Sequence, residues 1–314
     1  MAADGVIPIA LLLGPTAGGK TTLAIELARR LPAGGECVSA DSMQVYRGMD
    51  IGTAKPTAAE RAAAPHHLLD IADPATDGFS VETWLVAAER VIAEIRGRGR
   101  TPIVVGGTNL YVKALLEGMF EGPAPDAELR ERLLTLDDAT LRTSLERVDP
   151  VAAERIHPND RKRTVRAIEV YEATGRPISE LQQQWDQGRV REDVRIVGLD
   201  WPAPEINRRI NARVAAMFGD GLVAEVAALQ AAGRLGPQAA AALGYRQILD
   251  HLAGRTTLEE AREQIKIRTR RFAKQQRTWL RRFRAYPNTV WLPAAELTPQ
   301  DLVEKALAWI AEGG

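Results

Sequence analysis

Residues 9–22, IALLLGPTAGGKTT, have the types and spacing that could hold a polyphosphate. An apolar run leads into Gly14-x-x-x-x-Gly19-Lys20-Thr21, which fits the P-loop pattern. Glycine permits tight turns in which successive backbone N–H groups face anionic oxygens, lysine supplies a mobile charge, and the threonine hydroxyl can bind Mg²⁺. The spacing therefore predicts a polyphosphate site with Mg²⁺, although the loop alone does not specify the phosphate compound.

A P-loop needs a strand before it and a helix after it. The apolar run predicts the strand, and Thr22 to Leu31 predicts a helix whose N-terminal end adds a positive potential. The loop residues expected to bind the phosphate groups are Gly14, Thr16, Ala17, Gly18, Gly19, Lys20 and Thr21. The expected metal ligand is Thr21.

Asp41 is a candidate catalytic residue outside the P-loop. It follows a strand expected over 36–40, and in open α/β sheets ligands bind beyond the carboxyl ends of the strands. An aspartate here can instead cap a helix or close a turn, and both roles stay open. A further strand, expected over 102–105, ends in Gly-Gly-Thr at 106–108, where a Walker-B strand would end in aspartate. This difference counts against a motor-type ATPase.

Composition limits the class of protein. With 314 residues, the chain is long enough for one large α/β domain and an added piece, and its 45% apolar and 26% charged residues are ordinary for a globular protein. No apolar run approaches the roughly 20 residues of a membrane span, so we expect a cytoplasmic protein without a membrane partner. The single cysteine, Cys37, excludes an intramolecular disulfide and is expected to be buried.

The order of expected elements predicts a P-loop NTPase-like parallel sheet with flanking helices and an inserted all-helical domain. Strands are absent from the pattern between about 121 and 193, and a strand expected over 195–199 returns the chain to the sheet. We therefore expect core residues 1–120, a helical insertion over 121–193, and a second core part over 194–314.

The chain has no net charge, but basic residues are concentrated in one segment near its C-terminus. Residues 266–284 include nine basic residues and no acidic one, with Phe272, Trp279 and Phe283 expected on one helical face. A solvated helix docked by these aromatics would explain the rings but not the missing acids, so we favour a nucleic-acid surface. His66 and His67 are poor metal candidates, because adjacent side chains cannot easily face one ion and no third ligand is near.

Seven motifs resemble the tRNA dimethylallyltransferase family, in order over nearly the whole chain. They are GPTAGGKT at 14–21, SADSMQVYRGMDIGTAKP at 39–56, HHLLDI at 66–71, VVGGTNLYVKAL at 104–115, HPNDRKRTVRAIEV at 157–170, ALGYRQ at 242–247 and KQQRTWLRRF at 274–283. The resemblance implies transfer of a dimethylallyl group from its diphosphate to N6 of adenine 37 in the tRNA anticodon loop. Because no zinc-finger tail follows, a bacterial-type enzyme is expected, and we expect a monomer.

The same resemblance implies roles for individual residues. Asp41 would accept a hydrogen bond and then the proton from N6, Thr108 would form the opposite wall, and Lys20 would stabilise the leaving diphosphate. Arg166 and Arg213 would be further diphosphate clamps. The residues expected to contact tRNA are Asp41, Ser42, Met43, Gln44, Thr108, Lys162, Arg163, Arg166, Gly244, Tyr245, Arg246, Lys274, Arg277 and Arg281.

Two other functions fit parts of the pattern. A small-molecule or nucleoside kinase on the same scaffold would use Asp41 as a base toward a hydroxyl and would turn over ATP, but it leaves the acid-free helix unexplained. A non-catalytic RNA-binding P-loop protein would have no need of Asp41.

Overall fold

The computed structural model describes residues 6–76, 78–119, 122–123, 126–186 and 190–311. The chain divides into two compact units, a core made of Met1–Leu115 with Arg191–Gly314 and an insertion made of Leu116–Val190. The insertion expected over 121–193 therefore starts and ends a few residues later than this unit does.

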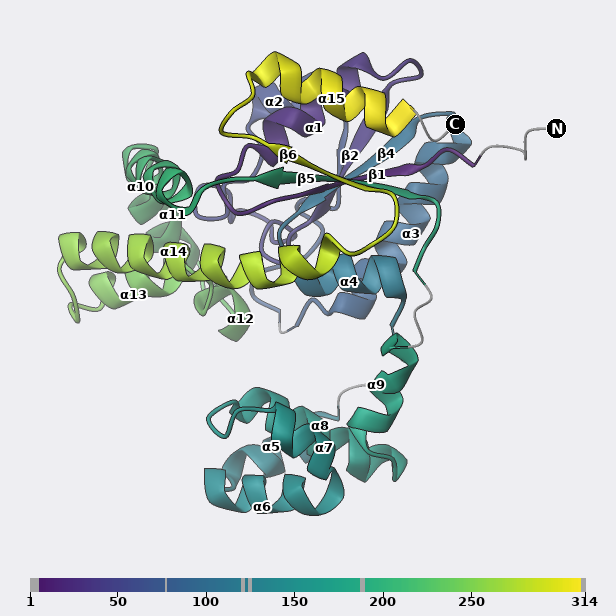
Figure 1. Cartoon of the computed structure of the whole chain (residues 1–314). Coiled ribbons are helices and arrows are strands. Elements are labelled where there is room, and N and C mark those ends of the chain that lie inside the picture. Colours follow the sequence, from purple (N-terminus) through teal and green to yellow (C-terminus); the bar gives the residue numbers. More distant parts are fainter. Residues whose placement is uncertain (1–5, 77, 120–121, 124–125, 187–189, 312–314) are drawn as a thin grey trace. The chain divides into compact units, whose positions relative to one another are not determined.

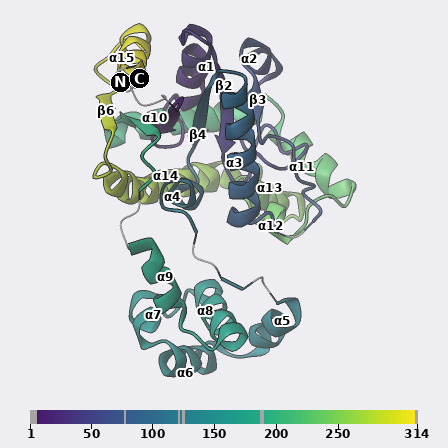
Figure 2. The same ribbon diagram turned by 90° about the vertical axis from the view of Figure 1, so that its right-hand side faces the viewer.

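The core is built on six strands that all pair in parallel. Their order across the sheet is β3-β2-β4-β1-β5-β6, with β3 and β6 at opposite edges (Figure 2). Helices lie on both faces, so β1 is buried along its whole length and reads as a continuous apolar run. The strands are β1 Ile9–Leu13, β2 Gly35–Ala40, β3 His66–His67, β4 Thr101–Gly106, β5 Val194–Asp200 and β6 Thr289–Pro293.

Helices α1, α2 and α15 cover one face of the sheet, and α3, α4 and α14 lie on the other (Figure 1). The first face packs Leu12, Leu27, Ile103 and Ile310 into one apolar cluster. The helices of the core are α1 Lys20–Arg30, α2 Ala58–Ala63, α3 Val81–Gly97, α4 Asn109–Glu117, α10 Ala203–Gly219, α11 Leu222–Ala231, α12 Pro237–Ala240, α13 Tyr245–Leu252, α14 Leu258–Phe283 and α15 Pro299–Ala311. Helix α1 begins two residues before the expected 22–31, so Lys20 and Thr21 lie in its first turn.

A second apolar cluster joins α10, α11, α13 and α14 to the segment after β2. Tyr46, Ile210, Val226 and Tyr245 are buried in it. No single helix of the described residues is long and apolar enough to cross a membrane. The bent pair α10 and α11 reaches the length and composition, but its buried side chains belong to this cluster.

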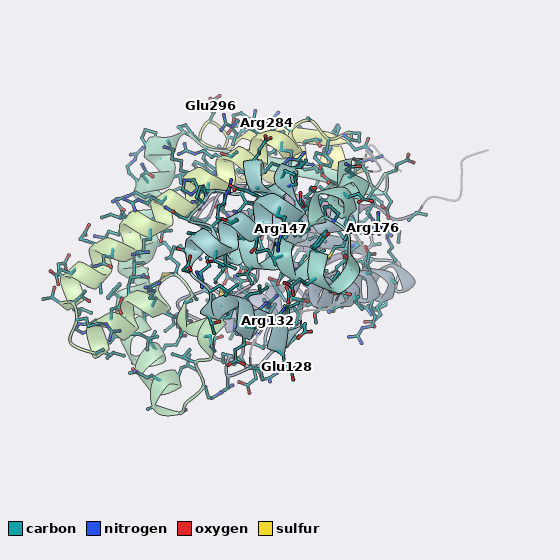
Figure 3. The ribbon with its side chains drawn as sticks, turned by 90° about the horizontal axis from the view of Figure 1, so that it is seen from below. Glu128, Arg132, Arg147, Arg176, Arg284 and Glu296 are labelled. Atoms are coloured by element: carbon teal, nitrogen blue, oxygen red, sulfur yellow. The ribbon has the colours of Figure 1, made fainter. Side chains whose placement is uncertain are left out.

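Aspartates cap four of the helices of the insertion. Asp126, Asp137, Asp149 and Asp160 each accept a hydrogen bond from a backbone N–H of the helix that follows. The helices are α5 Ala127–Thr135, α6 Asp138–Val148, α7 Pro150–Arg155, α8 Arg161–Thr174 and α9 Ile178–Asp186. They enclose an apolar cluster of their own, while charged side chains such as Arg132, Arg147 and Arg176 are exposed (Figure 3).

Cys37 is buried, as expected, and burial raises the pKa of its thiol to about 12. Nε2 of His67 bonds the Glu36 carboxylate at 2.6 Å, and Nδ1 of His66 bonds the Ala64 carbonyl oxygen at 2.8 Å. In the described part of the chain, no group of three or more His, Cys, Asp or Glu side chains could hold a metal ion.

Candidate active site

The P-loop connects β1 to α1 and turns through two left-handed residues, Ala17 at φ 60° and Gly19 at φ 85°. Gly19 is the N-cap of α1 and has no side chain to cap it, so the first N–H groups of the helix stay available to an anion. The N–H of Gly18 donates to the Pro15 carbonyl oxygen at 3.1 Å and closes the turn.

Lys20 lies inside this loop. Its Nζ donates to the carbonyl oxygens of Gly14 and Pro15, both at 2.9 Å. The pKa of Lys20 is lowered to about 8, chiefly by burial of the ammonium and then by the nearby Arg213 guanidinium, while the Asp41 carboxylate opposes the shift. The site thus holds its cations together at an electrostatic cost that a bound anion would relieve.

A cavity of about 450 Å³ opens in front of the loop. Three cations, Lys20, Arg209 and Arg213, line it with a single carboxylate, that of Asp41. Burial lowers the pKa of Arg213, and Asp41 opposes this. An excess of positive charge inside a partly enclosed cavity suits a diphosphate, because reduced solvation strengthens the attraction.

Asp41 stands at the end of β2, where the sequence places it. Its Oδ1 accepts the backbone N–H groups of Met43 at 2.8 Å and Gln44 at 3.3 Å, so the turn-closing role is present. Oδ2 accepts no hydrogen bond from the described residues, and the residue lines the cavity. One carboxylate oxygen is therefore fixed by the turn while the other is available to a ligand.

The ends of β2 and β4 come close enough for Thr108 to bond the residues on either side of Asp41. A Cβ at Gly106 would lie 2.2 Å from the Ala40 carbonyl oxygen, so only glycine permits this approach. The N–H of Thr108 donates to the Ala40 oxygen at 3.2 Å, and Oγ1 of Thr108 accepts the N–H of Ser42 at 2.9 Å. The expected opposite wall is thus tied to the segment that follows Asp41.

A second cavity, of about 310 Å³, adjoins the first. The two share Thr16, Asp41, Arg213 and Phe272 in their linings. Apolar residues of the second are Met43, Ile210, Val214, Met217, Ala242, Leu243, Ile265 and Phe272. A charged cavity therefore meets an apolar one, with the Asp41 carboxylate where they meet.

Gln44 and Tyr245 hold the backbone around this cavity. Nε2 of Gln44 donates to the carbonyl oxygens of Thr53 at 3.3 Å and Ala54 at 3.2 Å, so its amide fixes the loop after β2. Tyr245 is completely buried, and its hydroxyl donates to the Glu225 carboxylate at 2.6 Å. The ring lies against Gly52 in the segment after β2, so the side chain is shielded from solvent, and the expected contact of residue 245 with tRNA stays a prediction.

Gly244 and Arg246 flank this buried ring. Gly244 has φ 97° and donates its N–H to Oε1 of Gln247 at 2.8 Å, and Arg246 is exposed in the first turn of α13. Their contacts with tRNA stay predictions.

Three expected site residues lie on α8 of the insertion. Arg166 pairs with the buried Glu169 carboxylate at 2.9 Å and donates to the Pro123 carbonyl oxygen at 2.9 Å. Arg163 pairs with Asp160 at 2.5 Å, and Lys162 is exposed. Within the insertion the Arg166 guanidinium already has partners, and the roles given to all three residues stay predictions.

The basic segment is part of the longer helix α14, which begins at Leu258. Lys274 and Arg281 are exposed and Arg277 is half-buried, and none of the three forms an ion pair within the described ranges. The three aromatics do not dock together: Phe283 is fully buried, whereas Phe272 is 41% exposed and lines both cavities. Helix α14 runs without a break from Leu258 to Phe283, so the three rings keep the helical face expected for them and differ only in how far they are buried.

Sequence reasoning missed two site residues. Gln276 of α14 accepts the N–H of Thr16 at 2.9 Å and donates to the Gly107 carbonyl oxygen at 3.1 Å, which joins the basic helix to the P-loop. Arg209 lies one helical turn before Arg213 on α10 and donates to the Ala17 carbonyl oxygen at 2.7 Å. Arg209 and Arg213 are four residues apart and so share a helical face, which could have indicated Arg209 from the sequence. No residue pattern indicated a role for the neutral Gln276 among its basic neighbours.

Comparison with known proteins fits this geometry. A family model described as IPP transferase matches residues 44–283. The tRNA dimethylallyltransferase of Anaeromyxobacter dehalogenans is 48% identical over 304 residues, covering 95% of this chain and 98% of that relative. The chain belongs to the tRNA dimethylallyltransferase family. A member of this family from Geobacter sulfurreducens is 46% identical over 289 residues and covers 90% of the chain.

Solved structures of this family have the same fold. The tRNA isopentenylpyrophosphate transferase of Bacillus halodurans has a TM-score of 0.71 at 38% identity, over 98% of this chain and 96% of that one. A eukaryotic dimethylallyltransferase described as acting on tRNA has a TM-score of 0.80 at 27% identity, over 96% of this chain and 77% of that one. The parallel sheet and the P-loop-like core predicted from the sequence are confirmed.

Proposed function

We propose that this chain transfers a dimethylallyl group from dimethylallyl diphosphate to N6 of adenine 37 in the tRNA anticodon loop and releases diphosphate. The observation that carries the proposal is the meeting of the charged cavity and the apolar cavity at Asp41. The diphosphate suits the first cavity and the allylic chain the second. The allylic carbon would then lie beside the Asp41 carboxylate, which can accept a hydrogen bond from the acceptor amine.

The P-loop residues would act on the leaving group. As the allylic C–O bond breaks, negative charge develops on the diphosphate, and Lys20, Arg213 and the loop N–H groups are positioned to stabilise it. The Thr21 hydroxyl lines the same cavity in the first turn of α1, and no described residue is its hydrogen-bond partner. It fits a Mg²⁺ ligand, and the ion would neutralise part of the diphosphate charge when bound.

Asp41 would act on the acceptor. The adenine must leave its stack in the anticodon loop to reach a site inside the protein, at a cost of a few kcal/mol. Oδ2 would then accept a hydrogen bond from N6 and take its proton as the C–N bond forms, while Oδ1 stays fixed by the turn. Thr108, which binds the segment after Asp41, would keep this geometry.

The tRNA backbone would be held by cations that have no acidic partner. Lys274, Arg277 and Arg281 on α14 have this property, and α14 reaches the P-loop through Gln276. Phosphate contacts of this kind position a nucleic acid without reading its sequence.

The test is the mass of tRNA after incubation with dimethylallyl diphosphate and Mg²⁺. We expect adenosine 37 to gain about one isopentenyl unit after nuclease digestion, and no gain with the Lys20→Ala variant. A kinase would instead consume ATP and leave the tRNA mass unchanged, and that outcome would overturn the proposal.

A further inference from the structure

The outer side of the P-loop is held by a stacked pair of side chains, Trp201 and Arg209. Nε of Arg209 donates to the Ala17 carbonyl oxygen at 2.7 Å, and Nε1 of Trp201 donates to the Gly18 carbonyl oxygen at 3.1 Å. The guanidinium carbon lies 4.5 Å from the centre of the Trp201 ring. Two consecutive carbonyl groups of the loop are thus bound by residues that follow β5.

These two bonds decide where the loop N–H groups point. In a trans peptide the C=O of one residue and the N–H of the next point in opposite directions. Holding the Ala17 and Gly18 oxygens on the outer side therefore turns the N–H groups of Gly18 and Gly19 inward. Gly18 closes the turn on Pro15, so the N–H of Gly19 is left for an anion.

The pair also stabilises an unfavourable backbone conformation. Ala17 has φ 60°, which residues with a side chain adopt rarely. The hydrogen bond from Arg209 to the Ala17 oxygen offsets this strain in the conformation that an anion needs. Arginine suits the position because its planar group can stack on an indole and donate in its own plane at the same time.

Arg209 has donors beyond the one it uses. Among the described residues only its Nε has a hydrogen-bond partner. Its Nη2 lies 3.6 Å from where a Cβ of Gly19 would be, and the residue lines the cavity with Lys20 and Arg213. The remaining N–H groups therefore lie beside the place where an anion would meet the loop.

We propose that Arg209, stacked on Trp201, is a further diphosphate-binding residue that fixes the P-loop through Nε and binds a diphosphate oxygen through its terminal N–H groups. This inference rests on the proposed function, because it takes diphosphate as the anion of the loop. Arg209 gives the site a third cation, and stacking on Trp201 orients it before the ligand arrives. A lysine at position 209 would have to be ordered when the ligand binds.

The test compares Arg209→Gln with Arg208→Gln, which removes the same charge from the neighbouring, exposed arginine of α10. The probe is inorganic diphosphate with Mg²⁺, titrated calorimetrically into the full chain. For Arg209→Gln we expect the Kd to rise by roughly 10- to 100-fold, as for the loss of a charge-assisted hydrogen bond. For Arg208→Gln we expect a Kd within about twofold of wild type.

Two further variants separate orientation from charge and from folding. Arg209→Lys keeps the charge but cannot donate in the same plane, so it should recover only part of the affinity. Trp201→Phe keeps a ring but loses the bond to Gly18, so it should weaken diphosphate binding without changing tRNA affinity. Arg209→Lys and Trp201→Phe still test the proposal if Arg209→Gln fails to fold.

The inference is overturned if the folded Arg209 variants and Trp201→Phe bind diphosphate as wild type does. It is also overturned if Arg209→Gln and Arg208→Gln lose affinity equally, because the effect would then be general electrostatics. A wild-type protein that neither binds diphosphate nor modifies tRNA would refute the proposed function instead.

Discussion

The buried lysine of the P-loop makes ligand binding depend on pH. Without an anion, burial and Arg213 hold the pKa of Lys20 at about 8, against an ordinary value of 10.5. A bound diphosphate places negative charge beside the ammonium and returns the pKa toward or above 10.5. The difference corresponds to about 3 kcal/mol of interaction between the ligand and the charged lysine.

The sign of the effect follows from proton binding. Above pH 8 the empty site loses its proton while the complex keeps it, so binding takes up a proton and weakens as pH rises. At pH 9 about a tenth of the free protein has a charged Lys20, so the affinity should be roughly tenfold lower than at pH 7. The unfolded chain keeps the proton up to 10.5, so the free protein should gain stability from pH 8 to 10.5.

The assay is calorimetric titration with dimethylallyl diphosphate at pH 7, 8 and 9, in buffers that differ in ionisation enthalpy. At pH 9 we expect uptake of about 0.9 proton per ligand bound. The Lys20→Met variant is the control, because it has nothing to titrate at this position and should bind weakly with little change across this range. If wild type and Lys20→Met show the same pH dependence and the same proton uptake, the account of Lys20 is wrong.

Variants at three other places test separate parts of the site. Asp41→Asn and Asp41→Ala should bind both substrates nearly normally but slow the single-turnover step by about 10² to 10⁴; a fast, merely less stable Asp41→Asn would leave this aspartate only its turn-closing role. Reversing the charges on α14 at Lys274, Arg277 and Arg281 should weaken tRNA binding and lower the slope of log affinity against log salt by roughly one for each lost phosphate contact, and an unchanged slope would place the tRNA surface elsewhere. Tyr245→Phe should lose about 2 kcal/mol of unfolding free energy in urea while tRNA affinity stays unchanged; reduced affinity at wild-type stability would return this residue to the tRNA surface.

The parts of this fold that the sequence predicts are those set by local pattern. The strand, glycine turn and helix of the P-loop are consecutive, so their spacing alone indicates the arrangement. The position of Asp41 follows from the end of β2, because parallel strands present their carboxyl ends at one edge of the sheet. The helical insertion follows from the loss of strand pattern, and its aspartate caps are also local signals.

The parts that the sequence did not predict depend on contacts between distant segments. Gln276 accepts the N–H of Thr16, 260 residues away, and no local pattern indicates that a helix otherwise rich in cations would contact the P-loop at this residue. The sequence shows Tyr245 only as an aromatic beside a basic residue, whereas in the fold Glu225 accepts its hydroxyl hydrogen bond and the ring is completely buried. The exposure of Phe272 follows from the cavity beneath α14 and not from its helical spacing.

The most direct test of the central claim is single-turnover transfer from labelled dimethylallyl diphosphate to two anticodon stem-loops that differ only at position 37. One carries adenosine and the other inosine, which lacks the N6 amine. We expect label in the adenosine stem-loop, retained on that nucleoside after digestion, and none in the inosine stem-loop although it binds. Equal labelling of both, or label on another nucleotide, would contradict an acceptor amine held at Asp41.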